Sequence, residues 1–179
     1  MEIGTQTWMA ENLAYLPSVN TKTDSSTTVA KYYVYNYNDT SVSTAKANSN
    51  YTTYGTLYNW SAASNACLSG WHLPTRDEWL VLENYVGGLP GMYLKATSGW
   101  ESYSKISNED SYGFSALPGG YYYGSDFDSV GFKGAWWTAM MSSSDFAYYR
   151  GMDYASSSVS RDNSSYKYYG YSVRCVKDD

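Results

Sequence analysis

The chain has 179 residues, with 12 Lys or Arg against 17 Asp or Glu and a formal net charge of −5. No apolar run approaches the roughly 18 to 20 residues that a membrane-spanning helix needs, and the weak negative charge disfavours a nucleic-acid-binding surface. Because 43% of the residues are hydrophobic and 18% are aromatic, we expect one folded domain over residues 1–179, with no nucleic-acid partner and no direct membrane insertion.

Side chains that commonly perform catalysis or bind metals are scarce. The chain has one His and two Cys, too few for a His-ligated metal site or a Ser-His-Asp triad. His72 stands in the apolar phrase Gly-Trp-His-Leu-Pro, which is typical of a structural histidine, and Asp77, Glu78 and Glu83 are expected at the start and on the exposed face of a helix. We therefore predict a non-enzymatic protein with no catalytic residue, no metal and no cofactor.

The two cysteines, Cys67 and Cys175, are too far apart for a CxxC motif. They form either a disulfide, which would stabilise the fold by roughly 4 to 5 kcal/mol in the loop-entropy account, or two buried thiols in a reducing compartment. Glu2 follows Met1 directly, so no signal peptide is expected in this chain. The domain is then part of a longer exported protein or of a particle assembled inside a cell, and we expect it at a cell surface, outside the cell or on a virion.

The first half of the chain predicts a strand and two helices. Residues 2–15 suggest a strand and a turn, and residues 16–50 are rich in Ser, Thr and Asn, which indicates a long surface excursion with one short hairpin. Residues 57–67 have helical spacing and carry Cys67 at the end. A capping box of Thr75 and Glu78 begins a second helix, which ends at Gly87 and Gly88.

The second half predicts short strands and no helix. Candidate strands cover residues 93–96, 114–118, 135–139, 146–152 and 171–176. Residues 121–171 hold ten of the 22 tyrosines, alternating with Ser, Asp and Gly. Such a segment cannot bury all its rings, so several are expected at the surface, where apolar area marks a binding site.

Five phrases occur in order along the chain: IGTQTWMAENL at 3–13, YGTLYNWSAASNAC at 54–67, SGWHLPTRDEW at 69–79, YGFSALPGG at 112–120 and YSVRCVKD at 171–178. Together they resemble the Fibrobacter succinogenes major paralogous domain, a family of bacterial surface proteins, from which residues 16–50 depart as an expected surface insertion. The resemblance implies an α+β, C-type-lectin-like fold of the type shared with formylglycine-generating enzyme. In that fold two helices pack on short twisted antiparallel sheets, long irregular loops carry a ligand face, and the termini are close together.

A narrower resemblance concerns residues 122–169. They look like the variable segment of proteins diversified by a diversity-generating retroelement, in which asparagine codons mutated at adenine yield Tyr, Ser, Asp, Asn, Gly, Ala and Phe. Lys133, Met141 and Met152 cannot arise in this way and must be fixed by the template, unless the segment is an undiversified, Tyr-rich relative.

The predicted function is ligand binding by a Tyr/Ser/Asp-rich surface, as in other interfaces where aromatic rings anchor and short polar groups orient. The partner is an unknown protein or glycan on a host or target cell, and oligomers are possible. The alternatives are a fixed adhesin or structural domain of the same family, and a carbohydrate-active enzyme. Calcium-dependent sugar-binding tripeptides do not occur, and Asp126, Asp128 and Asp145 are not expected to bind metal. The candidate ligand-binding residues are Tyr122, Tyr123, Ser125, Asp126, Asp128, Ser129, Phe132, Ser142, Ser143, Ser144, Asp145, Phe146, Tyr148, Arg150, Tyr154, Ser156, Asn163, Tyr166, Tyr168 and Tyr169.

Overall fold

The computed structural model describes residues 1–178 and has a mixed α+β architecture, as predicted. The helices are α1 (Val42–Lys46), α2 (Ser49–Tyr54), α3 (Trp60–Ala63), α4 (Arg76–Val86) and α5 (Pro90–Leu94). The strands are β1 (Glu2–Ile3), β2 (Gln6–Thr7), β3 (Tyr32–Tyr33), β4 (Leu57–Tyr58), β5 (Trp71–His72), β6 (Gly119–Tyr122), β7 (Phe127–Val130), β8 (Lys133–Met141), β9 (Phe146–Asp153), β10 (Val159–Tyr166) and β11 (Val176–Lys177).

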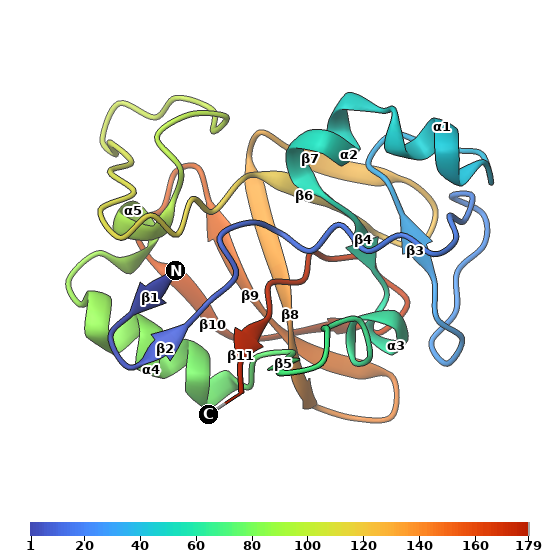
Figure 1. Cartoon of the computed structure of the whole chain (residues 1–179). Coiled ribbons are helices and arrows are strands. Elements are labelled where there is room, and N and C mark those ends of the chain that lie inside the picture. Colours follow the sequence, from blue (N-terminus) through green and yellow to red (C-terminus); the bar gives the residue numbers. More distant parts are fainter. Residues whose placement is uncertain (179) are drawn as a thin grey trace.

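A five-stranded sheet in the order β10-β9-β8-β6-β7 forms the centre of the molecule. β6 and β8 run parallel, and the other neighbours are antiparallel. Residues 16–54 lie to one side of this sheet and residues 90–118 to the other (Figure 1). Trp136 and Trp137 are consecutive in β8, so their indoles project to opposite faces, and each anchors a different core cluster.

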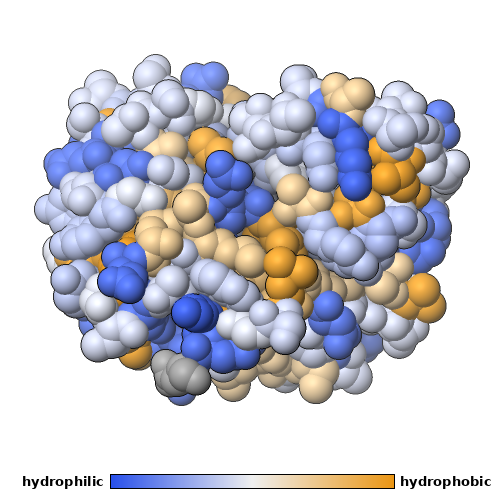
Figure 2. All heavy atoms as spheres, viewed as in Figure 1, coloured by the Kyte–Doolittle hydropathy of each residue, from blue (hydrophilic) through white to orange (hydrophobic). Residues whose placement is uncertain are grey.

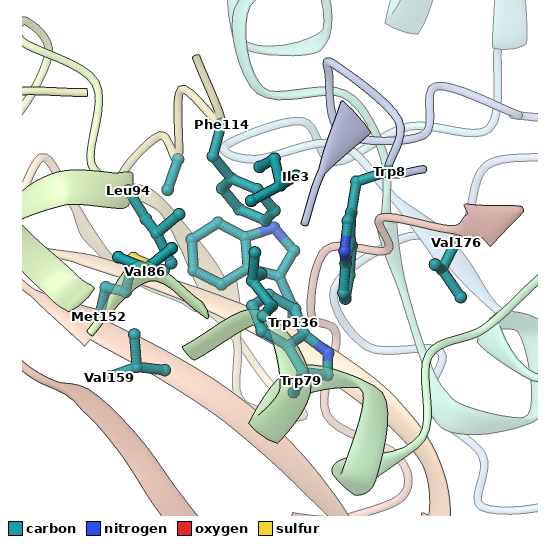
Figure 3. Close-up of a cluster of buried hydrophobic side chains, with 12 residues drawn as sticks. Ile3, Trp8, Trp79, Val86, Leu94, Phe114, Trp136, Met152, Val159 and Val176 are labelled. Carbon is teal, nitrogen blue, oxygen red and sulfur yellow. The ribbon is translucent and has the colours of Figure 1, made fainter. Parts of the chain in front are cut away.

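The first core lies between the sheet and α4. The predicted capping box is confirmed: Thr75 Oγ1 accepts from the Glu78 N–H, and Glu78 Oε2 accepts from the Thr75 N–H. Helical spacing then turns Trp79, Leu82 and Val86 inward. Trp79 packs near Trp136 and against Trp8, with the rings of Trp8 and Trp79 centred 4.9 Å apart (Figure 3).

The second core lies on the opposite face of the sheet, against α3 and the C-terminal segment. Cys67 and Cys175 form a disulfide, which decides between the two alternatives left open by the sequence. The helix predicted over residues 57–67 is shorter than expected. Leu57–Tyr58 is strand β4, and the buried Asn59 side chain accepts from the Ala62 N–H, so the helix begins only at Trp60.

The segment 16–50 was expected to be a surface excursion with a hairpin, and the structure corrects this. It contains α1 and begins α2, and it forms a small core of its own around Val34 and Tyr37. Strand β3 pairs with β4 rather than within the segment. The polar composition concealed this packing because the core needs only a few apolar side chains, which are scattered among Ser, Thr and Asn.

Three further predictions of secondary structure are corrected. Residues 93–96 are not a strand, because Pro90 favours the first turn of α5. Residues 114–118 and 171–176 make isolated bridges and only the short β11. Strands β7 and β10 were not predicted, since their Ser- and Asp-rich sequences have low β-propensity and pairing with neighbours decides their conformation.

The segments near the two termini are paired: Trp8 bridges Val176, and the Met9 N–H donates to the Cys175 carbonyl at 3.0 Å. Strands over residues 135–139 and 146–152 are confirmed within β8 and β9. None of the helices in residues 1–178 has the length and apolar character needed to cross a membrane. The surface drawn in Figure 2 carries its hydrophobic atoms in separate groups among hydrophilic side chains.

Candidate ligand-binding groove

A groove of about 450 Å³ lies on the face of the central sheet that is turned away from α4. Its floor is formed by small residues, Gly134 and Ala135 of β8 and Gly151 of β9. A Cβ atom at Gly151 would lie 2.8 Å from Ser160 Oγ, so glycine at this position keeps the floor open. The volume falls within the range of about 300 to 1,000 Å³ that is usual for small-molecule sites.

Strand alternation decides which residues of β9 reach the groove. Tyr149, Gly151 and Asp153 line it, and Met152 also borders it although its side chain packs in the first core. The intervening side chains point toward α4: Tyr148 lies against the Arg76 guanidinium, 4.2 Å from its ring centre, and Arg150 Nε donates to Glu83 Oε1 at 3.0 Å. The prediction chose Tyr148 and Arg150, which face α4, because sequence alone does not tell which alternating set faces outward.

The prediction that Arg150 contacts a ligand at the surface is therefore wrong. It is 3% exposed and shares the fully buried carboxylate of Glu83 with Arg161, whose Nε lies 2.6 Å from Glu83 Oε2. Burial lowers the pKa of Arg150, and the neighbouring Glu83 acts against that effect. Glu83 was expected on an exposed helix face, and this expectation was wrong.

A β-bulge decides which residues of β10 face the groove and which face α4. The register with β9 shifts between Ser160 and Asn163, and Asp162 adopts a positive φ of 59°. Ser160 and Asn163 line the groove, whereas Arg161 and Asp162 reach Glu83 and Arg76 on the other side. The extra residue of a bulge allows this switch of direction without ending the strand.

Tyrosine rings form the wall of the groove. Tyr171 is at the centre, with its ring 4.7 Å from Tyr149, 5.9 Å from Tyr121 and 6.3 Å from Tyr169. Burial raises the pKa of each of these four phenols, so they are neutral at physiological pH and can donate as well as accept hydrogen bonds. Of the four, only Tyr169 was among the predicted ligand-binding residues.

An aromatic cluster of Phe146, Tyr166, Tyr168 and Tyr169 adjoins the groove through Tyr169. Phe146 and Tyr166 have ring centres 4.3 Å apart, Tyr166 and Tyr168 stack at 5.1 Å, and Tyr168 and Tyr169 meet edge to face at 5.2 Å. Tyr166 is 42% exposed. All four residues were predicted, and the structure brings them together, with Tyr169 next to Tyr171.

The predicted residues of the loop between β6 and β7, and those of β7 itself, form a separate surface. Tyr123, Ser125 and Asp128 are exposed, while Asp126 and Ser129 are half-buried. Asp126 pairs with Lys22 at 3.2 Å, and its pKa is lowered by the Phe127 N–H and by Lys22. Gly124 packs directly on Tyr168, which joins this loop to the aromatic cluster.

Tyr122 is corrected from a surface residue to a core residue. It is fully buried, its ring stacks on Tyr33 with the centroids 4.0 Å apart, and its hydroxyl donates to the Lys22 carbonyl. Its neighbour Tyr121, on the opposite side of the same strand, lines the groove. The sequence Tyr121-Tyr122-Tyr123 offers no signal that separates these three roles.

The remaining predicted residues lie at the two ends of the long strands. Ser142, Ser143, Ser144 and Asp145 form the exposed turn between β8 and β9. The buried Lys167, which the sequence analysis missed, holds this turn by donating to the Ser144 carbonyl at 2.8 Å. At the other end, Phe132 and Tyr154 pack edge to face at 5.3 Å, and Ser156 lines the groove with Asn163 and Tyr169.

The single histidine bridges two carboxylates. His72 Nε2 lies 2.6 Å from Glu78 Oε1, and His72 Nδ1 lies 2.6 Å from Asp178 Oδ1. Burial acts to lower the pKa of His72, but the two carboxylates outweigh it and the pKa is raised. Within residues 1–178, no three His, Cys, Asp or Glu side chains come together in an arrangement suited to a metal ion.

The scaffold around the groove has the sequence of a known family. The family model described as Fibrobacter succinogenes major domain matches residues 1–177. The chain belongs to this family. No curated protein and no solved structure matches the chain.

In this Fibrobacter succinogenes major domain, the phrases that carry the resemblance form the scaffold. Trp8, Trp79, Phe114 and Arg174, one from each of four phrases, are buried. Arg174 donates to the Phe114 carbonyl and to Asn12 Oδ1, so it joins three of the phrases. The groove lies in the part of the domain between the last two phrases, closed at one side by Tyr171.

Proposed function

We propose that the domain is a non-enzymatic ligand-binding module and that the groove, with the adjoining aromatic cluster, is its binding surface. The observation that carries the proposal is the concentration of four tyrosines, four serines and Asn163 around one concave, small-residue floor on a rigid sheet. Tyr supplies contact area at low entropic cost, and Ser and Asn supply adaptable hydrogen bonds. Asp153 is the single carboxylate among the lining residues, which disfavours a two-carboxylate glycosidase.

We further propose that the fold is C-type-lectin-like and that the groove belongs to a segment diversified by a retroelement. The lining residues of β9, β10 and their connection support this second part. They are Tyr149, Gly151, Met152, Asp153, Ser156, Ser158, Ser160, Asn163 and Ser165. All except Met152 can arise from an asparagine codon by changes at adenine. The partner would be a protein or glycan on a target cell, with this domain displayed at a cell or virion surface.

Genome sequence tests the diversification. We expect a near-identical template repeat close to the gene, differing from codons 122–169 only at adenines, and a reverse transcriptase gene beside it. The absence of both in a complete genome would leave a fixed adhesin or structural domain of the same family.

Binding to intact cells tests the groove itself. The labelled domain, the double variant Tyr149→Ser/Tyr169→Ser and the control Tyr85→Ser would be compared by flow cytometry on a panel of bacterial and epithelial cells. Tyr85 is 59% exposed on α4, across the sheet from the groove. We expect the double variant to lose binding while keeping its circular dichroism spectrum, and the control to bind normally. Equal binding by a folded double variant would exclude the groove.

A further inference from the structure

The chemistry of the groove indicates the class of ligand, provided that the groove is the binding surface proposed above. Its polar lining consists mainly of Ser156, Ser158, Ser160, Ser165 and Asn163. A hydroxyl or a primary amide both donates and accepts hydrogen bonds. Such a lining best matches ligand groups that also donate and accept hydrogen bonds. Hydroxyl groups have this property.

The charge of the groove disfavours an ionic ligand. Lys133 and Asp153 are the charged residues among its lining, and they are directly opposite each other on β8 and β9. Their charges have opposite sign and lie at the same end of the groove. The tyrosine phenols add no charge, because burial raises the pKa of Tyr149 and Tyr171. An anionic ligand would lack the fixed cation cluster that usually selects it.

The tyrosine wall offers flat apolar surfaces next to these hydroxyls. Tyr171 is buried and supports Tyr149, with ring centres 4.7 Å apart, while the half-buried rings of Tyr149 and Tyr169 line the groove. A pyranose ring has an apolar face of C–H groups and a rim of hydroxyls, so it can pack on a phenol ring while its rim meets serine and asparagine. Few other biological ligands combine both surfaces in one rigid ring.

Hydrogen bonds from Lys95 and Gly91 fix the backbone at the end of the groove near Asp153. Lys95 is fully buried, and its ammonium donates to the carbonyls of Asp153 and Ser156, at 2.9 Å each. Gly91 is also packed against the backbone of Ser158, with its N–H donating to the Ser157 carbonyl at 2.8 Å. The groove is therefore preformed, which lowers the entropic cost of binding a rigid ligand.

The position of the groove disfavours a peptide strand as the occupant. The edges of the central sheet are β10 and β7, whereas the groove lies on the face of the sheet between them. Strand addition needs a free edge. We propose that the groove binds one or two pyranose units of a neutral oligosaccharide, with tyrosine faces beneath the rings and serine and asparagine at their hydroxyls.

An array of immobilised neutral, sialylated and sulfated oligosaccharides tests this inference directly. We expect the wild-type domain to bind neutral structures, and Asn163→Leu and Tyr149→Leu to weaken binding to the best neutral oligosaccharide at least tenfold. The control Tyr85→Ser should bind within twofold of wild type. Binding restricted to sialylated or sulfated structures and lost in the same variants would overturn the inference.

A second experiment treats the cells that bind the domain with reagents that alter their glycans or their proteins. Periodate, which cleaves the vicinal diols of sugars, should abolish cell binding, and sialidase should leave it unchanged. If protease abolishes binding while periodate does not, the ligand is a protein surface and the inference is wrong; the groove remains the binding site if the groove variants also lose binding to these cells. If the groove variants bind periodate-sensitive cells as well as wild type does, both the inference and the proposed function fail.

Discussion

The ring of Tyr33 lies on the ring of Tyr122, with centroids 4.0 Å apart and planes inclined by 24°. Tyr33 is in β3, within the segment that has the composition of a surface loop, and Tyr122 is in β6 next to the groove residue Tyr121. The hydroxyl of Tyr33 donates to the Asp24 carbonyl at 2.8 Å. The segment 16–50 thus supports the strand that delivers Tyr121 to the groove.

Tyr33→Ala should reduce the free energy of unfolding by about 3 to 5 kcal/mol, because it removes a buried ring and leaves a cavity against Tyr122. Tyr33→Phe keeps the ring and loses one hydrogen bond, which should cost about 0.5 to 1.5 kcal/mol. Urea unfolding followed by fluorescence measures both values. An equal cost for the two variants would mean that the stacking contributes nothing.

Glu83→Gln should destabilise the domain by about 3 to 5 kcal/mol, because it leaves Arg150 buried without a carboxylate. The matched control is Glu101→Gln at an exposed position, which should change the free energy of unfolding by less than about 0.5 kcal/mol. Chemical denaturation at pH 7 provides the comparison. Similar values for the two variants would contradict the role assigned to this buried ion pair.

Replacing Cys67 and Cys175 by Ala should lower the free energy of unfolding by about 2 to 5 kcal/mol, since the disulfide closes a loop with a sequence separation of 108. The same loss should appear when the wild-type protein is unfolded in the presence of a reducing agent. In that medium the wild type and the double variant should have nearly the same stability. A reductant effect of equal size in the double variant would point to another cause.

Lys95 should make the stability rise with pH above neutrality. Burial lowers the pKa of this ammonium to about 8, from the ordinary lysine value of 10.5. Between these values the unfolded chain binds more protons at this site than the folded chain, so the contribution of Lys95 to the free energy of unfolding increases with pH. From pH 7.5 to 10 the increase should be about 2 kcal/mol.

Lys95→Met tests this assignment. The difference in stability between wild type and this variant should grow in favour of wild type between pH 7.5 and 10. Lys46→Met, at an exposed position of α1, should keep the wild-type pH dependence. A constant difference between wild type and Lys95→Met across this range would show that the ammonium is not perturbed by burial.

Local signals in the sequence predicted several parts of the fold correctly. The helix that begins after Thr75 follows from its capping box and from apolar positions one helical turn apart, and both act within a single turn. The strands that contain Trp136 and Ala147 follow from their aromatic and apolar content. The family motifs predicted the assignment that the comparison shows over residues 1–177.

Placement of the site depended on information that no local pattern contains. Tyr121, Tyr122 and Tyr123 are chemically identical neighbours, yet they occupy the groove, the core and the surface. Which one is buried depends on the pairing of β6 with β8 and on the ring of Tyr33, about 90 positions away in the chain.

The sequence by itself determined the family, the main helix and the Tyr- and Ser-rich character of the segment that holds the groove, because these depend on residue type and short-range spacing. The tertiary structure decided which face of β9 is open, which residues the bulge in β10 redirects, and where Glu83 and Arg150 meet. A shift of one residue in strand register exchanges the two faces without any change in composition. That is why Tyr149 lines the groove and Arg150 lies in the core.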